Sequence, residues 1–151
     1  MKISKATITD LNIVQSIVYD TVNAIYPNYY PYEVVSFFLA HHKAENIEKD
    51  INKGMVFLFK LNDKFIGIGT IEEKHLNRVF FLPEYQGQGY GTQIMDFLEK
   101  EIRKKYKTSL VDSSLPAYSF YEKRGYSPIE YHQYKVENNR VLCYHVMKKK
   151  L

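Results

Sequence analysis

The spacing of apolar residues divides the chain into a helical first third and a strand-rich remainder. Between Leu11 and Ile25, apolar residues recur every three or four positions, which predicts a helix capped by Thr9 or Asp10. The segment Tyr26–Pro31 ends this helix, and a second helix is expected to begin with Pro31 in its first turn.

From Met55 onward the pattern favours strands. Short runs rich in Phe and Ile alternate with turn signals, and one amphipathic helix interrupts them after a glycine-rich loop. The expected strands are Met55–Lys60, Lys64–Ile71, His75–Leu82, Thr108–Asp112 and two that surround Asn138-Asn139. A strand, a helix and a strand over His75–Asp112 predict a parallel pair with a right-handed crossover. The expected fold class is therefore α/β or α+β, with a mixed sheet.

The composition is that of a globular protein and excludes several classes. The chain has 151 residues, 45% hydrophobic and 25% charged, so we expect a single domain over residues 1–151. No apolar run approaches the ~20 residues of a membrane span. Met1–Lys5 lacks the apolar stretch of a secretory signal, and one cysteine, Cys143, allows no internal disulfide. These features favour a cytoplasmic protein.

The formal charge of +4 is concentrated in two basic clusters. One lies between Lys100 and Lys107, and the other is Lys148–Lys150 at the C-terminus. We interpret them as the solvated end of a helix and a frayed tail. An RNA-binding module is the weaker alternative, because no RRM-type aromatic and basic strand signature accompanies the lysines.

The loop Gln86–Thr92 is the most informative segment for function. Gly87, Gly89 and Gly91 alternate there between a strand and a helix, so that successive N–H groups can point into one concavity. With the helix N-terminus behind it, the loop predicts a site for phosphate or pyrophosphate. A Walker loop fits poorly because no lysine precedes Thr92, and in a dinucleotide fingerprint the third glycine would come one position later.

The spacing Gln-x-x-Gly-x-Gly after a strand and Pro83 resembles the acyl-CoA loop of the Gcn5-related N-acetyltransferases (GNAT). A second stretch, with Ala117, Phe120–Lys123 and Gly125-Tyr126, resembles another signature of that family. The order of elements agrees over essentially the whole chain. The resemblance implies a GNAT-like α/β (α+β) fold: a mixed, mostly antiparallel sheet of six to seven strands, flanked by helices, with a splayed parallel pair that forms the acyl-CoA slot.

The resemblance also implies an enzyme that moves an acetyl group from acetyl-CoA to a primary amine by direct attack, without a metal. The pyrophosphate would rest on the loop, and the pantetheine arm would pair with the preceding strand. Lys123, Arg124 or the basic helix would then meet the 3′-phosphate. The expected residues for acetyl-CoA are Phe80, Phe81, Leu82, Gln86, Gly87, Gln88, Gly89, Tyr90, Gly91, Thr92 and Ser114.

Two residues are candidates for the chemistry of transfer. Tyr121 aligns with the family's acid tyrosine, which would protonate the leaving thiolate. His75 lies where some members carry a catalytic glutamate, while Glu72 or Glu73 nearby, or a water-relayed base, stays open. The expected acceptor-site residues are Tyr26, Tyr29, Tyr30, Glu72 and Asp112.

A second function stays open, that of a non-catalytic CoA sensor or interaction domain of the same fold. Ser114 stands where the family often has asparagine, and this departure would suit such a domain. We expect the acceptor to be a small-molecule or peptide amine, with no nucleic acid or membrane partner. A homodimer also stays open.

Overall fold

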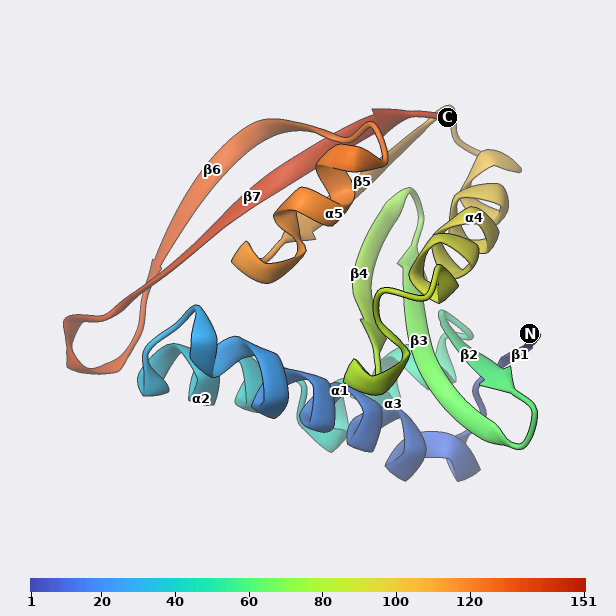
Figure 1. Cartoon of the computed structure of the whole chain (residues 1–151), viewed down its shortest axis with the longest axis horizontal. Coiled ribbons are helices and arrows are strands. Elements are labelled where there is room, and N and C mark those ends of the chain that lie inside the picture. The colour runs from blue at the N-terminus through green and yellow to red at the C-terminus, as the bar shows by residue number, and fades with distance from the viewer.

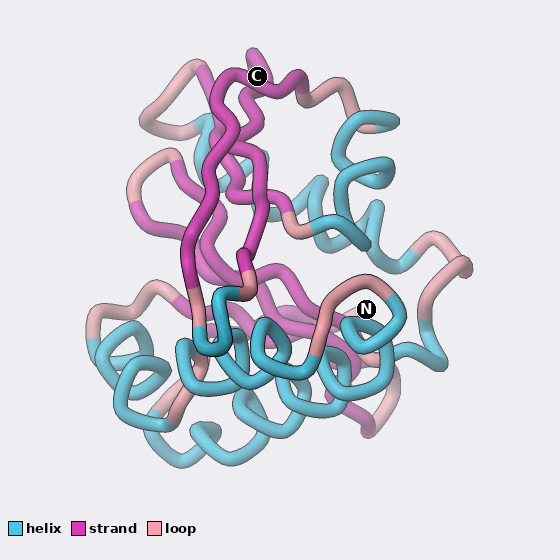
Figure 2. Tube along the Cα trace, turned by 90° about the vertical axis from the view of Figure 1, so that its left-hand side faces the viewer, coloured by secondary structure: helices cyan, strands magenta, loops and turns pink.

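The computed structural model describes residues 1–151 and shows a seven-stranded sheet with helices on both faces (Figures 1 and 2). The strand order is β1-β2-β3-β4-β5-β7-β6, and every neighbouring pair is antiparallel except β4 and β5. The strands are β1 (Lys2–Lys5), β2 (Val56–Leu61), β3 (Lys64–Glu72), β4 (His75–Phe81), β5 (Thr108–Ser113), β6 (Ser127–Lys135) and β7 (Val141–Lys150). The predicted mixed sheet with one parallel pair is confirmed.

Two hydrophobic cores lie on opposite faces of the sheet. The first joins α1 (Leu11–Ile25), α2 (Tyr32–His41) and α3 (Ala44–Asn52) to β2 and β3. The second joins α4 (Tyr90–Arg103) and α5 (Tyr118–Lys123) to β3, β4 and β5. Each helix turns the apolar stripe seen in the sequence toward the sheet, as burial of that stripe requires.

The ends of the first two helices differ slightly from the expectation. A short 3₁₀ turn, Ile8–Asp10, precedes α1, and the Asp10 carboxylate accepts hydrogen bonds from the Thr7 N–H and hydroxyl at 2.8 and 2.9 Å. Thr7 therefore starts the 3₁₀ turn, while Asp10, one of the two predicted cap residues, lies directly before α1. Pro31 lies just before α2 in extended backbone instead of in its first turn, because the residue before the helix needs no helical φ and ψ.

The parallel pair of β4 and β5 is short, and the candidate site lies where these two strands separate. β4 and β5 are in register only at His75 with Leu110 and Leu76 with Val111. Beyond these two pairs, β5 continues to Ser113 beside β7 while β4 continues to Phe81 beside β3. The two central strands therefore diverge, which confirms the predicted splay and leaves one edge of β4 without a neighbouring strand.

The prediction of a frayed C-terminal tail was wrong. Lys148–Lys150 belong to β7 and pair with β5 at Leu110, Ser109 and Thr108. Figure 1 shows β6 and β7 as a long hairpin that arches from this end of the sheet to α2. At its far end the ring centroid of Tyr134 lies 5.0 Å from that of Phe37 in α2. The hairpin thus bridges the divergent strands and the helical layer.

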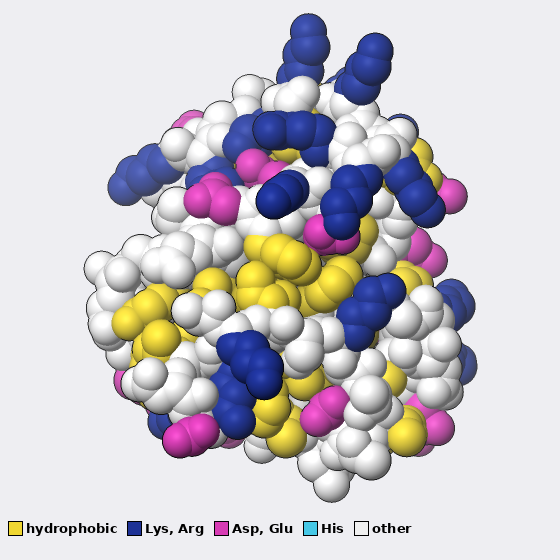
Figure 3. Space-filling view, turned by 90° about the vertical axis from the view of Figure 1, so that its right-hand side faces the viewer, with side chains coloured by type: hydrophobic (Ala, Val, Ile, Leu, Met, Phe, Trp, Pro, Cys, Tyr) yellow, Lys and Arg dark blue, Asp and Glu magenta, His cyan; other side chains and the backbone are white.

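Figure 3 shows the side of the molecule that carries α4 and both termini, with Lys and Arg side chains gathered in its upper part. An apolar patch lies below them on the same face. No helix is both long and apolar enough to span a membrane.

Candidate functional site

The glycine loop between β4 and α4 has the backbone conformation that its sequence predicts. Gly87 and Gly89 have φ values of +73° and +84°, in the left-handed region where a side chain is strained. A Cβ at either position would meet no atom within 4 Å, so the requirement is conformational. Gly91 differs, because a Cβ there would lie 2.8 Å from Cζ of Phe81. Two glycines therefore shape the loop, and the third lets α4 approach β4.

Consecutive N–H groups of this loop are left without acceptors. From Gly87 to Thr92, six successive N–H groups donate to no acceptor in the chain, and the first helical bond of α4 runs from Gln93 to the Gly89 oxygen at 3.2 Å. The side chains of Gln86 and Gln88 brace the loop through the carbonyl oxygens of Phe81 and Glu84. A row of free donors at a helix N-terminus is suited to an anion.

The open edge of β4 leads from this loop into the interior. The Leu82 N–H donates to Ile66 of β3 at 2.8 Å, so by the alternation of an antiparallel ladder the backbone groups of Phe80 and Leu82 face β3. The backbone groups of Val79 and Phe81 face the other way, into the opening between β4 and β5 where the sequence predicts the acyl-CoA slot. The Phe81 oxygen already accepts from Thr21 and Gln86, both at 3.2 Å. Val79, absent from the sequence prediction, therefore offers the best groups for pairing with an extended chain.

A cavity of about 430 Å³ lies where β4 and β5 diverge. Residues from the 3₁₀ turn Tyr26–Asn28, from α2, α3, β3, β4, β5 and α5, and from the β6–β7 hairpin line it, and most of them are apolar or aromatic. Of the predicted site residues, the lining includes Tyr26, Glu72, Phe80, Asp112, Ser114 and Tyr121. The glycine loop is not part of this lining, and the open edge of β4 separates the two.

Tyr121 lies on α5 at the inner end of this cavity and is 4% exposed. Its ring packs against those of Phe120 and Tyr126, with centroids 5.4 and 5.7 Å away. No group of the chain forms a hydrogen bond with its hydroxyl. Burial raises the pKa of this phenol well above its ordinary value of 10.0. The cavity thus contains a protonated donor that has no partner within the protein.

The three tyrosines predicted as an acceptor wall occupy three different environments. Tyr26 is 6% exposed, lines the cavity and donates its hydroxyl to Ser114 Oγ at 3.1 Å. Burial raises the pKa of Tyr26 to about 12. Tyr30 is also buried, but it lies behind the lining, and its oxygen accepts from the Leu115 N–H at 2.7 Å. Tyr29 is 52% exposed and lies outside the cavity.

Asp112 and His75 form a pair at the point where the strands separate. The distance between His75 Nε2 and Asp112 Oδ1 is 3.0 Å. Asp112 lines the cavity, whereas His75 does not. Glu72 lines it as well, and its carboxylate accepts from Asn77 Nδ2 at 3.2 Å. The structure therefore places both predicted carboxylates, Glu72 and Asp112, in the cavity lining. His75 lies outside the lining, next to Asp112.

Comparison with known proteins identifies the family. The model of the acetyltransferase (GNAT) domain matches residues 25–151. The chain belongs to the GNAT acetyltransferase family. No curated protein sequence gives a significant match to it.

Solved structures agree with this GNAT fold over nearly the whole chain. A GCN5-related N-acetyltransferase from Rhodopseudomonas palustris has a TM-score of 0.89 at 20% identity, covering 99% of this chain and 95% of its own. PaiA N-acetyltransferase from Thermoplasma acidophilum, in complex with coenzyme A, has a TM-score of 0.78 at 19% identity, with coverage of 99% and 98%. YncA from Salmonella typhimurium, a putative acetyltransferase with its cofactor acetyl-CoA, has a TM-score of 0.66 at 15% identity, with coverage of 100% and 94%.

Sequence reasoning missed one buried polar cluster of this GNAT domain. Arg78 of β4 is 6% exposed, and it donates from Nε to His42 Nδ1 at 3.0 Å and from a terminal nitrogen to Asp50. Burial and the neighbouring guanidinium lower the pKa of His42 to about 3, so this imidazole is neutral. All three residues line the cavity. The available signal was a cation between the apolar residues Leu76 and Phe80 of one strand.

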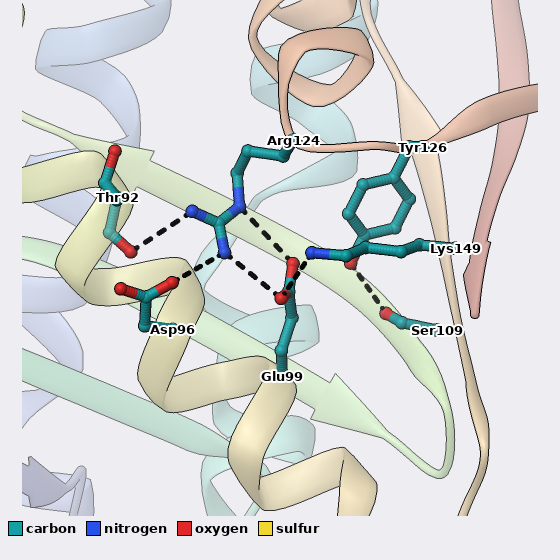
Figure 4. Close-up of polar contacts among 7 residues, drawn as sticks. All are labelled: Thr92, Asp96, Glu99, Ser109, Arg124, Tyr126 and Lys149. Atoms are coloured by element: carbon teal, nitrogen blue, oxygen red, sulfur yellow. Dashed lines mark hydrogen bonds and ion pairs between the residues drawn. The ribbon is translucent and has the colours of Figure 1, made fainter. Parts of the chain in front are cut away.

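A second network fixes the two helices of the GNAT site relative to each other (Figure 4). Arg124, directly after α5, binds Asp96 at 2.8 Å and Glu99 at 3.1 Å, both on α4. Lys149 of β7 also binds Glu99, at 2.7 Å, and the Tyr126 hydroxyl donates to Ser109 Oγ at 2.9 Å. Arg124, predicted as one contact for the 3′-phosphate, is thus engaged within the protein, whereas Lys123 is exposed.

Proposed function

We propose that this GNAT domain transfers an acetyl group from acetyl-CoA to a primary amine by direct attack, without an acetylated enzyme intermediate. One observation carries the proposal. The partnerless hydroxyl of Tyr121 and the carboxylate of Asp112 line a single cavity, at the point where β4 and β5 diverge. A proton donor and a proton acceptor thus face the space that a thioester in the slot would reach.

The anionic and extended parts of acetyl-CoA match the rest of the site. Its pyrophosphate would accept hydrogen bonds from the free N–H groups between Gly87 and Thr92. Its pantetheine amides would pair with Val79 and Phe81 as an added strand. This path ends at the cavity, so the acetyl group would lie beside Tyr121. Two structural neighbours described with coenzyme A or acetyl-CoA support this choice of donor.

Tyr121 would assist the departure of the thiol. The neutral amine nitrogen attacks the thioester carbon, the new C–N bond forms, and the C–S bond breaks with its electron pair on sulfur. The nitrogen then loses its surplus proton, and the thiolate takes up a proton to leave as CoA thiol. A free thiol has a pKa of ~8.5, well below that of a buried phenol, so Tyr121 would stabilise the developing thiolate mainly by hydrogen bonding. Because the pKa of Tyr121 is raised, its hydroxyl is protonated throughout the neutral range.

Asp112 and His75 would remove the amine proton. The acceptor arrives as an ammonium ion and must lose one proton before its nitrogen can attack. Asp112 faces the cavity and would take this proton, directly or through water, while His75 would pass it to solvent. His75, whose side chain is 30% exposed, is accessible for that second step. The predicted base is thereby refined to a pair in which the carboxylate is the nearer group.

The first test separates an enzyme from a sensor. Acetyl-CoA is titrated into the protein by calorimetry, and a panel of amines is then screened for CoA release and N-acetylated products by mass. The proposal predicts acetyl-CoA binding and acetylation of at least one amine. Absence of binding at high micromolar acetyl-CoA would contradict it, and binding without any product would favour the non-catalytic alternative.

A further inference from the structure

The charge and lining of the cavity distinguish among classes of amine. Three carboxylates, Asp50, Glu72 and Asp112, and one guanidinium, Arg78, line it, which leaves a formal charge of −2. His41 and His42 also line the cavity but add no charge at physiological pH, because burial and the Arg78 guanidinium lower the pKa of both imidazoles below the ordinary value of 6.5. The surplus carboxylates, Glu72 and Asp112, are both exposed to solvent.

Arg78 is poorly placed to receive a carboxylate from a ligand. Arginine binds a carboxylate best through two parallel N–H groups. In Arg78 the Nε donor is taken by His42 and one terminal nitrogen by Asp50, so each of its two forks has one arm occupied. The side chain is only 7% exposed, and the carboxylate of Asp50 already balances its charge. An acceptor carboxylate could bind through two parallel N–H groups only by displacing one of these partners.

The body of the cavity is apolar. Seven of its 20 lining residues are Phe or Tyr. The buried rings of Tyr26 and Phe80 and the partly buried ring of Phe38 form one aromatic side, where the ring centroids of Tyr26 and Phe38 lie 4.8 Å apart in an edge-to-face arrangement. Aromatic faces attract cations and accept apolar groups, whereas an anion among them would lose its hydration without a partner.

We propose that the acceptor is a primary amine on an apolar or aromatic body that carries no carboxylate beside the amine. This inference rests on the proposed acetyl transfer and specifies its substrate class. A carboxylate on the carbon next to the nitrogen would lie near Asp112 and Glu72 when the amine reaches the thioester. Like charges placed together in this way oppose binding. Amines should therefore be acetylated in preference to the corresponding α-amino acids.

Matched pairs of acceptors test the inference. The rate of CoA release is measured for phenethylamine against phenylalanine, tyramine against tyrosine, and 3-methylbutylamine against leucine. Each amine is expected to have a kcat/KM at least ~10-fold above that of its amino acid, a difference of ~1.4 kcal/mol. Phenylalaninamide is the control for size, because it keeps the bulk of the carboxyl group without its charge. It should regain most of the difference.

Variants connect the preference to the cavity. Glu72→Gln should reduce the ratio of kcat/KM for the amine to that for the amino acid, whereas Glu45→Gln should not, because Glu45 is exposed and lies outside this cavity. Equal or faster acetylation of the amino acids would overturn the inference and leave acetyl transfer intact. A panel in which no member is acetylated although acetyl-CoA binds would also overturn it. Failure to bind acetyl-CoA would instead defeat the proposed function itself.

Discussion

At the scale of single residues, Arg78 shows how a buried charge shapes the cavity. Its guanidinium needs compensation inside the protein, and it receives this from Asp50 of α3 and from His42 at the end of α2. Two helical segments are thereby held against β4 at one point. Because His42 accepts the Nε–H bond, its protonation would break the contact and bring two positive charges together.

His42 should therefore make stability depend on pH. Its pKa is about 3 in the folded protein, against an ordinary value of 6.5. Between these values the unfolded chain binds a proton that the folded chain does not. This contribution to stability is complete above pH 6.5 and is lost as the pH falls toward 3, by up to ~1.4 kcal/mol per pH unit.

His42→Asn tests this prediction, because an amide oxygen can still accept from Arg78 but does not titrate. Urea unfolding of both proteins between pH 7 and pH 4 gives the comparison. The difference in unfolding free energy should change with pH in the sense that the wild type loses more stability on acidification. Parallel pH profiles for the two proteins would show that His42 does not have a lowered pKa.

At the scale of elements, the position of α5 relative to α4 depends on Arg124. This side chain joins the C-terminal end of the Tyr121 helix to Asp96 and Glu99 on the helix that follows the glycine loop (Figure 4). Glu99 is only 6% exposed and retains Lys149 as a second partner. Loss of Arg124 would thus weaken the network without leaving Glu99 without a counter-charge.

Arg124→Ala is expected to lower the free energy of unfolding by ~1–3 kcal/mol, the range for a partly compensated buried charge. Arg124→Lys should recover part of this loss, because it restores the charge without the planar fork. Glu122→Ala provides the control on the same helix, since Glu122 is exposed and should change stability by less than ~0.5 kcal/mol. Equal effects of Arg124→Ala and Glu122→Ala in urea unfolding would contradict this role.

The sequence predicted most elements because their signals are local. The helix over Leu11–Ile25 shows helical spacing of its apolar residues. The loop at Gly87–Gly91 contains positive φ values that glycine adopts without strain, so the glycines themselves indicate the turn. Lys148–Lys150 gave no such signal. These lysines are in a strand because β5 supplies their hydrogen-bond partners, and Lys149 reaches Glu99 and the face of Tyr126, 5.6 Å from its ring centroid. Pairing between distant segments decided their structure.

The candidate site also has a part that the sequence can predict and a part that it cannot. The loop and Tyr121 were predictable, since each belongs to a short motif of one segment. The cavity was not, because its lining comes from helices and strands that meet only in the folded chain. Tyr30 illustrates the limit. It lies in the same aromatic segment as Tyr26, but its hydroxyl accepts a hydrogen bond from the Leu115 N–H, and its side chain lies outside the cavity lining.

At the scale of the whole molecule, the charge of the surface and that of the cavity have opposite signs. The chain carries a formal charge of +4, and Lys and Arg gather on the side that carries α4 and both termini (Figure 3). The cavity, in contrast, has two surplus carboxylates. A basic surface suits an anionic donor such as acetyl-CoA, and an acidic cavity suits a cationic acceptor. In the proposed reaction, the fold would separate two substrates of opposite charge on either side of the β4 edge.

The central claim is that the slot binds acetyl-CoA while Tyr121 acts only on the transfer step. The most direct measurement compares wild type with Tyr121→Phe. Acetyl-CoA affinity comes from calorimetry, and the transfer rate comes from a single turnover with a free amine that the wild type accepts as substrate. The account predicts unchanged affinity and a transfer rate lower by ~100-fold or more, the usual contribution of a positioned proton donor. An unchanged transfer rate in the variant would contradict it.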